Sequence, residues 1–335
     1  MLPDWAPNAH PLIVHFPIAL FVAAVLVDAV LLAMRKHDAM SAVLFVLAGV
    51  GALAAFLSGR VAIDSLMVPP HVVPDSNAHA DWGLRAVWVV GLYGILRVVT
   101  WRLVPTWRAA VRIPLFLLSL VGLYVVWETA EHGGRLVFQH GLGTAVEATS
   151  VVEAPEPVAA GERLTGAWAW TPETGLGSLL QDASLNPDGA NARIEYVDGQ
   201  SVLAVDGPAT ILVADTTMGI QFDARLNTSQ LEGSVFLVHN ATDTDNFHYL
   251  RVGADLSVSQ GSRANGTDSR MSNGRYPSSD WHTVRVVGET THYRAYVDGV
   301  LVTHGHGDAA PAGRVGIHIE GGTVYLTNLA LTPIG

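Results

Sequence analysis

Histidine is the residue type in this chain with the clearest capacity for chemistry, because a neutral imidazole can ligate a metal ion or a haem iron. Five histidines at the ends of long apolar segments are candidate cofactor ligands: His10, His15, His79, His132 and His140. Imidazoles from two helices would suit a b-type haem or a metal. The alternative is that they are interfacial histidines, bonded to backbone carbonyls and to the nearby carboxylates Asp81, Glu128 and Glu131. His10 and His15 lie about 140° apart around a helix, so they do not share a face.

The second half of the chain offers carboxylates, but in no arrangement typical of a hydrolase. A glycosidase needs two carboxylates that flank one bond. The acidic side chains here are scattered over different segments, among them Asp223, Glu232, Asp255 and Glu320. We therefore expect a protein that is not an enzyme.

Two further clusters in the second half carry metal-ligand residue types. Asp243 and Asp245, within TDTDN, could supply oxygens to Ca²⁺, although the segment lacks the glycine and the distal glutamate of an EF-hand. A plain polar loop is the simpler interpretation. His304, His306 and Asp308 could bind a metal, or they could be exposed to solvent at the exit of a glycine-rich hairpin.

Four long apolar segments must position the histidines of the first half. We expect helices at 11–34, 41–63, 79–103 and 110–130. Each has roughly the 20 residues needed to cross a bilayer. The start MLPDWAPN lacks the basic region of a signal peptide, so we expect the first helix to remain in the mature protein. Residues 1–144 are thus predicted to be an all-α, four-helix transmembrane domain.

Basic residues predict the orientation of this domain. The loops after the first and third helices hold most of them: Arg35, Lys36, Arg102, Arg108 and Arg112. The positive-inside rule places both loops in the cytoplasm. The N-terminus, the C-terminal half and all five candidate histidines then lie outside, in the periplasm of a bacterial inner membrane. Two pairings of charges are also expected inside the bundle, Asp28 with Arg97 and Arg85 with Glu128.

Charge divides the chain into two parts. Residues 1–144 hold 9 Lys+Arg and 8 Asp+Glu, a net of +1, whereas residues 145–335 hold 10 and 22, a net of −12. An acidic half repels phosphate backbones, so nucleic acid is not an expected partner. The chain has no cysteine, which excludes disulfides, iron–sulfur clusters, thiolate zinc sites and covalently attached haem. Residues 145–163, rich in Pro, Glu and Ala, read as a linker.

From residue 164 to 335 the pattern changes to short alternating segments, such as ARIEYV at 192–197. Turn residues separate them, with Asp298-Gly299 as the clearest hairpin signal. Many short strands of this kind predict an all-β antiparallel sandwich.

Two resemblances to known families support this division. The segments NAHPLIVHFPIAL, Gly59-Arg60, NAHADWG and EHGGRLVFQHGLG resemble the DUF2231 family of four-helix membrane proteins over about residues 8–146. That resemblance implies that the five candidate histidines match family motif positions, and it implies no activity. Residues 281–331 resemble the closing strands of concanavalin A-like, laminin-G-type jelly rolls, which implies glycan or protein binding and, in some members, sugar hydrolysis.

The function favoured by these features is non-enzymatic. We expect an accessory subunit of a large respiratory or photosynthetic membrane complex. The bundle would dock against other membrane subunits and lipids, and the sandwich would bind an extracytoplasmic protein. One alternative is an electron-transfer protein with b-type haem at the outer histidines. Another is a membrane-tethered glycan-binding module.

Overall fold

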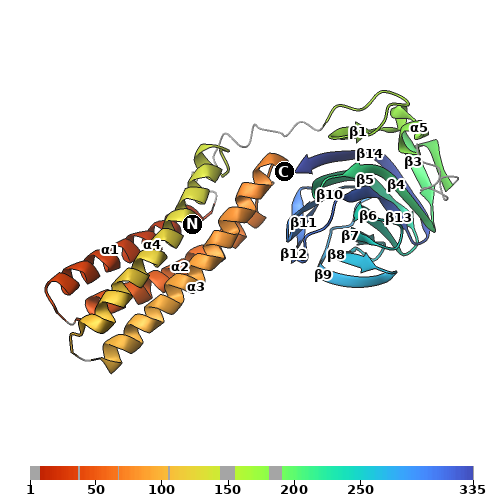
Figure 1. Ribbon diagram of the computed structural model, residues 1–335. Coiled ribbons are helices and arrows are strands. Elements are labelled where there is room, and N and C mark those ends of the chain that lie inside the picture. The colour runs from red at the N-terminus through yellow and green to blue at the C-terminus, as the bar shows by residue number, and fades with distance from the viewer. Residues whose placement is uncertain are drawn as a thin grey trace. The chain divides into compact units, whose positions relative to one another are not determined.

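The computed structural model describes residues 8–36, 38–66, 68–104, 106–143, 155–180 and 191–334. Within these residues the chain divides into two compact units. The first is a bundle of long helices and the second is built mainly of strands, as Figure 1 shows. This confirms the predicted fold class of a helical bundle followed by an antiparallel β-sandwich.

The helical unit consists of four long helices: α1 (His10–Ala33), α2 (Met40–Asp64), α3 (Val73–Leu103, preceded by the 3-10 turn Pro70–Val72) and α4 (Ala109–Phe138). All four are long and apolar enough to cross a membrane. Large apolar side chains such as Phe16, Leu26 and Trp88 are exposed on the bundle, as expected where the solvent is lipid.

Two of the helix ends differ from the sequence prediction. Helix α3 begins at residue 73 and not 79, and α4 ends at residue 138 and not 130. The polar residues at these ends broke the apolar pattern on which the prediction depended. These polar residues are nevertheless compatible with a helix. Asp75 lies in the first turn of α3 and Arg135 in the last turn of α4, where each charge interacts favourably with the helix dipole.

Aromatic rings and close helix contacts form the interior of the bundle. The rings of Phe45 and Tyr93 meet edge to face, with centroids 4.7 Å apart. A Cβ atom added to Gly49 of α2 would lie 3.1 Å from the Cα atom of Gly91 in α3. The small residues of α2 thus let the two backbones approach closely, as is common in membrane bundles.

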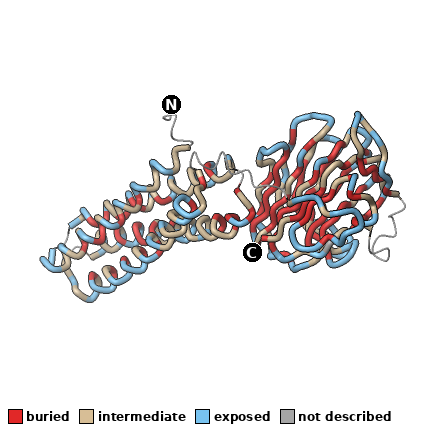
Figure 2. The backbone as a smooth tube through the Cα atoms, turned by 90° about the horizontal axis from the view of Figure 1, so that it is seen from above, coloured by how far each residue is buried: buried red, intermediate tan, exposed pale blue. Residues whose placement is uncertain are grey.

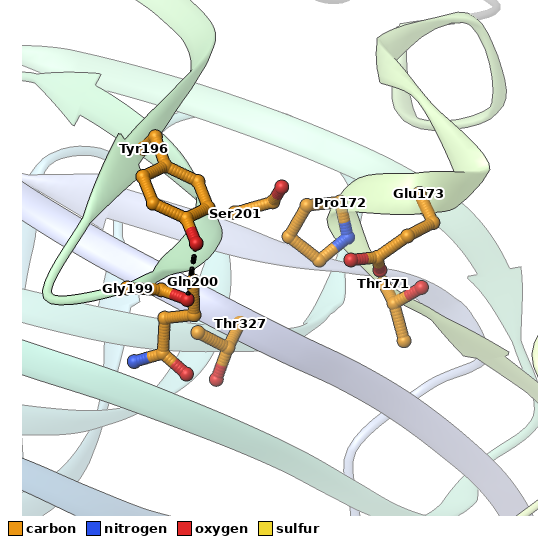
Figure 3. Close-up of a pocket in the computed structure, with 8 residues that line it drawn as sticks. All are labelled: Thr171, Pro172, Glu173, Tyr196, Gly199, Gln200, Ser201 and Thr327. Atoms are coloured by element: carbon orange, nitrogen blue, oxygen red, sulfur yellow. Dashed lines mark hydrogen bonds between the residues drawn. The ribbon is translucent and has the colours of Figure 1, made fainter.

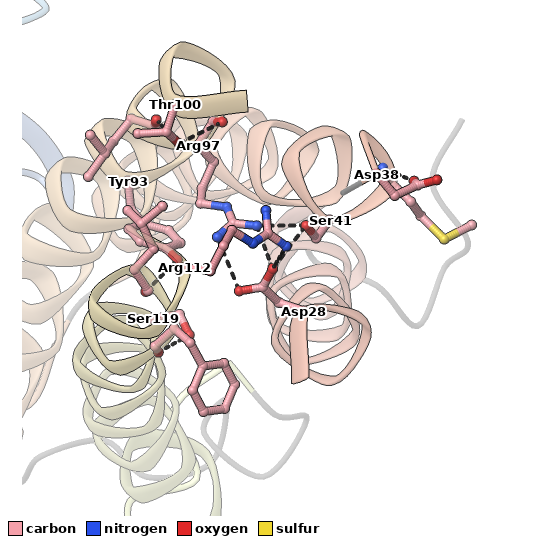
Figure 4. Close-up of polar contacts among 12 residues, drawn as sticks. Asp28, Asp38, Ser41, Tyr93, Arg97, Thr100, Arg112 and Ser119 are labelled. Carbon is pink, nitrogen blue, oxygen red and sulfur yellow. Dashed lines mark hydrogen bonds and ion pairs between the residues drawn. The ribbon is translucent and has the colours of Figure 1, made fainter. Parts of the chain in front are cut away.

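A buried ionic cluster confirms the predicted pairing of Asp28 with Arg97 (Figure 4). Asp28 Oδ1 accepts hydrogen bonds from Arg97 Nη2 at 2.5 Å and from Arg112 Nη2 at 2.9 Å. The side chains of Asp28 and Arg97 are each 1% exposed. One carboxylate therefore ties together α1, α3 and α4 inside the bundle. Arg85, expected beside Glu128, lies over the ring of Trp82 at 4.6 Å.

The β unit is a sandwich of two antiparallel sheets. An eight-stranded sheet has the order β12-β11-β10-β5-β14-β3-β2, with β1 also paired to β14, and a six-stranded sheet has the order β4-β13-β6-β7-β8-β9. The strands are β1 (Trp168–Trp170), β2 (Ala192–Val197), β3 (Gln200–Asp206), β4 (Ala209–Thr216), β5 (Gly219–Leu231), β6 (Ser234–Ala241), β7 (Phe247–Gly253), β8 (Ser257–Ala264), β9 (Thr267–Arg275), β10 (Trp281–Glu289), β11 (His292–Val297), β12 (Val300–His306), β13 (Gly313–Ile319) and β14 (Gly322–Ile334).

Alternation along the strands places one large apolar core between the sheets, where Figure 2 colours the backbone as buried. Phe222 of β5 and Leu237 of β6 lie in this core, and both are 0% exposed. The predicted hairpin at Asp298-Gly299 joins β11 to β12. Its two residues have φ values of 51° and 79°, which is the backbone that a two-residue turn of type I′ requires.

The predicted linker 145–163 differs in part from the structure. Residues 145–154 lie outside the described residues. The remainder belongs to the β unit, since Pro157 bridges to Ala169 and the amide of Gly161 donates to Ser178 Oγ at 3.1 Å. The β unit thus includes residues before 164.

Candidate functional site

His10 and His79 face each other at one end of the helical bundle. His10 is the first residue of α1 and His79 lies in the second turn of α3. Their ring centroids are 6.5 Å apart, with an angle of 67° between the ring planes. Because an imidazole nitrogen lies about 2 Å from a bound metal, two axial imidazoles on one metal have ring centroids about 6 Å apart. The observed separation therefore suits a single metal centre between the two rings.

Hydrogen bonds determine which ring nitrogen of each histidine could bind that metal. Ser58 Oγ donates its one proton to the Ala55 carbonyl at 2.9 Å. With that proton so placed, Ser58 Oγ accepts from His10 Nδ1, which lies 3.1 Å away. His79 Nδ1 lies 3.1 Å from the Thr129 carbonyl oxygen, which can only accept. His79 thus carries its proton on Nδ1 and keeps the Nε2 lone pair for a ligand, and His10 does the same in the tautomer that donates to Ser58. A hydrogen bond from the other nitrogen is what metal-ligating histidines usually make.

A glycine on a neighbouring helix makes room for each ring. A Cβ atom on Gly59 of α2 would lie 2.9 Å from His10 Cε1, and one on Gly133 of α4 would lie 2.9 Å from His79 Cε1. Either contact is shorter than van der Waals distance, so a side chain at these positions would push the imidazole aside. The two glycines therefore define where the rings lie.

The residues beside the pair are small, and two arginines lie near it in the sequence. Beside the rings, α2 and α4 present the small residues Ala55, Ser58, Gly59, Thr129 and Gly133. Arg60 follows Gly59, and Arg135 lies close after Gly133; both side chains are exposed. Arg60 would supply a cation for a carboxylate at the end of the bundle, whereas Arg135 already pairs with Glu131 at 2.7 Å.

Two of the five candidate histidines make contacts elsewhere. His15 is exposed on α1, and its Nδ1 donates to the Pro11 carbonyl at 2.7 Å. His140 Nε2 lies 2.7 Å from Asp75 Oδ2. A carbonyl and a carboxylate are the partners expected for interfacial histidines.

His132 has contacts of its own as well. Its Nδ1 donates to the Glu128 carbonyl at 2.8 Å. It also lies 3.7 Å from the Glu131 carboxylate, and its ring centroid is 6.2 Å from that of Trp82. Of the five candidates, the recorded ring contacts therefore join His10 to His79.

The sequence contains a signal for this pair that the sequence analysis did not use. The tripeptide Asn-Ala-His occurs at residues 8–10 and again at 77–79. The first copy starts α1 and the second lies near the start of α3. A repeated histidine at the start of two helices that run in the same direction predicts that both rings lie at one end of the bundle.

The β unit has a shallow depression with a polar lining (Figure 3). Its volume is about 430 Å³. The ring of Tyr196 is 73% exposed, and its hydroxyl donates to the Gly199 carbonyl at 2.6 Å. The lining comprises Thr171, Pro172, Glu173, Tyr196, Gly199, Gln200, Ser201 and Thr327. Hydroxyl, amide and carboxylate groups beside an exposed aromatic ring could hold a polar ligand.

The segment considered for Ca²⁺ is closed by its own hydrogen bonds. Asp243 accepts from the amide of Asp245 at 2.8 Å and from Asn246 Nδ2 at 2.8 and 2.9 Å. These bonds lower the pKa of the Asp243 carboxyl, because they stabilise its charged form. The carboxylate thus serves as the centre of a local turn.

Other carboxylates considered in the sequence are likewise engaged within the fold. Asp223 pairs with Arg285 at 2.6 Å, and Asp255 accepts from Ser257 Oγ at 2.5 Å. Of the group His304, His306 and Asp308, the two histidines do lie together, and the third member of their cluster is His292. Asp308 instead accepts a hydrogen bond from the Tyr293 hydroxyl through its backbone carbonyl.

Comparisons with known proteins agree with the two-unit architecture. Residues 6–146 match the family described as "Predicted membrane protein (DUF2231)", which agrees with the four long apolar helices in this part of the chain. No curated protein matches the sequence.

Several solved structures are similar to the chain. The carbohydrate-binding module CBM66 from Bacillus subtilis is 18% identical, with 42% of this chain and 92% of that chain covered and a TM-score of 0.36. The galectin LEC-6 from Caenorhabditis elegans is 18% identical, with 42% and 96% covered and a TM-score of 0.31. A prokaryotic β-1,3-1,4-glucanase (lichenase) from a mouse hindgut metagenome is 18% identical, with 44% and 85% covered and a TM-score of 0.34. These are similarities of fold, and no activity follows from them.

Proposed function

We propose that the helical unit holds one b-type haem between His10 and His79 and acts as an electron carrier in the membrane. The observation that carries this proposal is the opposed pair of rings at 6.5 Å. Both Nδ1 atoms are occupied by hydrogen bonds, so both Nε2 atoms can be axial ligands. Haem also suits the absence of cysteine, because a b-type haem needs no covalent attachment.

The proposed ligation restricts the chemistry. His10 and His79 would both hold the iron, which suits a haem used as an electron carrier. Transfer of single electrons is then the chemistry that the bound haem supplies. Beside these two ligands, Arg60 would bind a carboxylate of the haem.

The orientation expected from the basic loops places this haem near the outer face of the membrane. Electrons would pass between an extracytoplasmic partner and the membrane interior. The β unit is then the natural surface for that partner. The expected role as an accessory subunit of a large complex remains a prediction, and mass spectrometry of proteins that copurify in mild detergent tests it.

Paired histidine variants test the haem proposal. His10→Ala and His79→Ala should each abolish the haem absorption of the purified protein, because each removes an axial ligand. His15→Ala and His140→Ala are the matched controls, because both residues are candidate histidines that bond to other partners. Both control variants should retain the haem absorption. If His15→Ala and His140→Ala lost the haem absorption while His10→Ala and His79→Ala kept it, the ligands would be His15 and His140 and the proposal would be wrong.

A second candidate function rests on a different observation, the exposed ring of Tyr196 beside the polar depression. Such a surface could bind a glycan, with the ring against a sugar face and the polar groups bonded to hydroxyls. A glycan array with the full-length protein tests this candidate. Signals that Tyr196→Ala removes would support it, and an array without signals would exclude it.

A further inference from the structure

Three histidines gather on one face of the eight-stranded sheet in the β unit. His292 of β11 is directly opposite His306 of β12 in the antiparallel ladder. His304 precedes His306 by two positions on β12, so its side chain points to the same face. Their ring centroids are 4.6 Å apart for His292 and His306, 5.1 Å for His304 and His306, and 6.4 Å for His292 and His304.

The nitrogen atoms of these rings are close enough to share one ion. One ligand nitrogen from each ring lies within 4.8 Å of the other two. Around a tetrahedral ion with metal–nitrogen bonds of about 2 Å, ligand nitrogens are about 3.4 Å apart. Rotation of the side chains about χ1 and χ2 covers the remaining difference without movement of the strands. Because the strands fix the Cα positions, the three rings stay near one another with no ion to hold them.

We propose that His292, His304 and His306 bind one divalent transition-metal ion, with Zn²⁺ as the expected occupant. Neutral imidazoles prefer Zn²⁺, Cu²⁺, Ni²⁺ or Co²⁺ to Ca²⁺ or Mg²⁺, which take oxygen ligands. His306 is exposed, so an ion from solvent can reach the cluster. The negative net charge of this half of the chain also attracts cations.

The fourth ligand position has a candidate in the neighbouring strand. Glu289 of β10 is opposite His292 in the β10–β11 ladder, and opposite residues point to the same face. The Glu289 carboxylate accepts a hydrogen bond from Thr290 Oγ1 at 3.1 Å and is not a member of the three-histidine cluster, so we expect a water molecule as the fourth ligand. This site lies in the β unit and does not depend on the haem proposed for the helical unit.

Cobalt titration of the full-length protein in detergent tests the metal site, because Co²⁺ replaces Zn²⁺ and its tetrahedral complexes absorb visible light strongly. The wild-type protein should bind one Co²⁺ per chain, and Zn²⁺ should displace it. His306→Ala and His304→Ala should each weaken Co²⁺ binding by at least about tenfold, since even the loss of an outer-shell partner has an effect of that size.

Controls separate the cluster from other histidines. His318→Gln removes a histidine of the same unit that is bonded to Thr210, and His15→Ala removes one that donates to the Pro11 carbonyl. Both should leave the Co²⁺ titration unchanged. Because His306 is exposed, its variant should fold, which unchanged circular dichroism will verify. A wild-type protein that binds no Co²⁺, or an equal affinity in His306→Ala, would overturn the proposal.

Discussion

At the scale of single residues, the clearest consequence of burial concerns His239. It lies in the six-stranded sheet, is 1% exposed, and donates a hydrogen bond from Nδ1 to Asn240 Oδ1 at 2.8 Å. Burial, and next the nearby His248, lower its pKa from 6.5 to about 3. Burial also lowers the pKa of His248. Both rings are therefore neutral in the folded protein at neutral pH.

This lowered pKa predicts a pH dependence of stability for the β unit. Between pH 6.5 and 3 the unfolded chain binds a proton at His239 that the folded chain does not. The free energy of unfolding should thus be highest above pH 6.5 and fall by about 1.4 kcal/mol per pH unit toward pH 3 for this one group. Urea unfolding of the full-length protein, followed by β-unit tryptophan fluorescence, measures the slope. His239→Gln should flatten it, and a slope equal to that of the wild type would contradict the assignment.

A second prediction at this scale concerns the buried carboxylate of Asp28. Asp28→Asn would leave Arg97 and Arg112 as uncompensated charges inside the bundle. Breaking a buried ion pair in this way destabilises a protein by about 3–5 kcal/mol. Thermal unfolding in detergent should show a clear decrease in the midpoint. Asp38→Asn is the control, because Asp38 is an exposed residue that only accepts from the Met40 amide at 2.7 Å, and it should have little effect.

At the scale of helices, the glycines beside the histidines provide a test that keeps both proposed ligands. Gly59→Ala and Gly133→Ala each place a methyl group 2.9 Å from an imidazole carbon. We expect both variants to lose haem while circular dichroism shows an unchanged helix content. Gly91→Ala is the matched control, since a Cβ there meets nothing within 4 Å. If all three variants contained as much haem as the wild type, haem binding would not depend on the ring positions that Gly59 and Gly133 allow, and this part of the account would be wrong.

Features encoded by neighbouring residues in the sequence could be predicted, whereas features that depend on contacts between distant segments could not. The apolar runs predicted the four membrane helices, and Asp298-Gly299 predicted the hairpin, because these signals are local. The histidine pair was not predicted as a pair, because its rings meet only through the packing of helices. Likewise His292 was missed beside His304 and His306, because only the register of β11 against β12 brings it there.

At the scale of the whole molecule, the predicted topology has a simple consequence. If the helices cross the membrane four times with the basic loops inside, as we expect, the N-terminus and the β unit lie on its outer side. Alkaline phosphatase fused after residue 335 should be active in intact bacteria, and the same enzyme fused after Lys36 should be inactive. Green fluorescent protein at the same two positions should give the opposite pattern. An active fusion after Lys36 would reverse the orientation and move His10 and His79 to the cytoplasmic face.

The most direct test of the account is the reduced-minus-oxidised absorption spectrum of the full-length protein, purified in mild detergent from membranes with ample haem. The account predicts a six-coordinate, low-spin b-type spectrum and one haem per chain in a pyridine haemochrome assay. A preparation that folds and yet contains no haem would contradict the central claim. So would a spectrum that persists unchanged when both His10 and His79 are replaced by alanine.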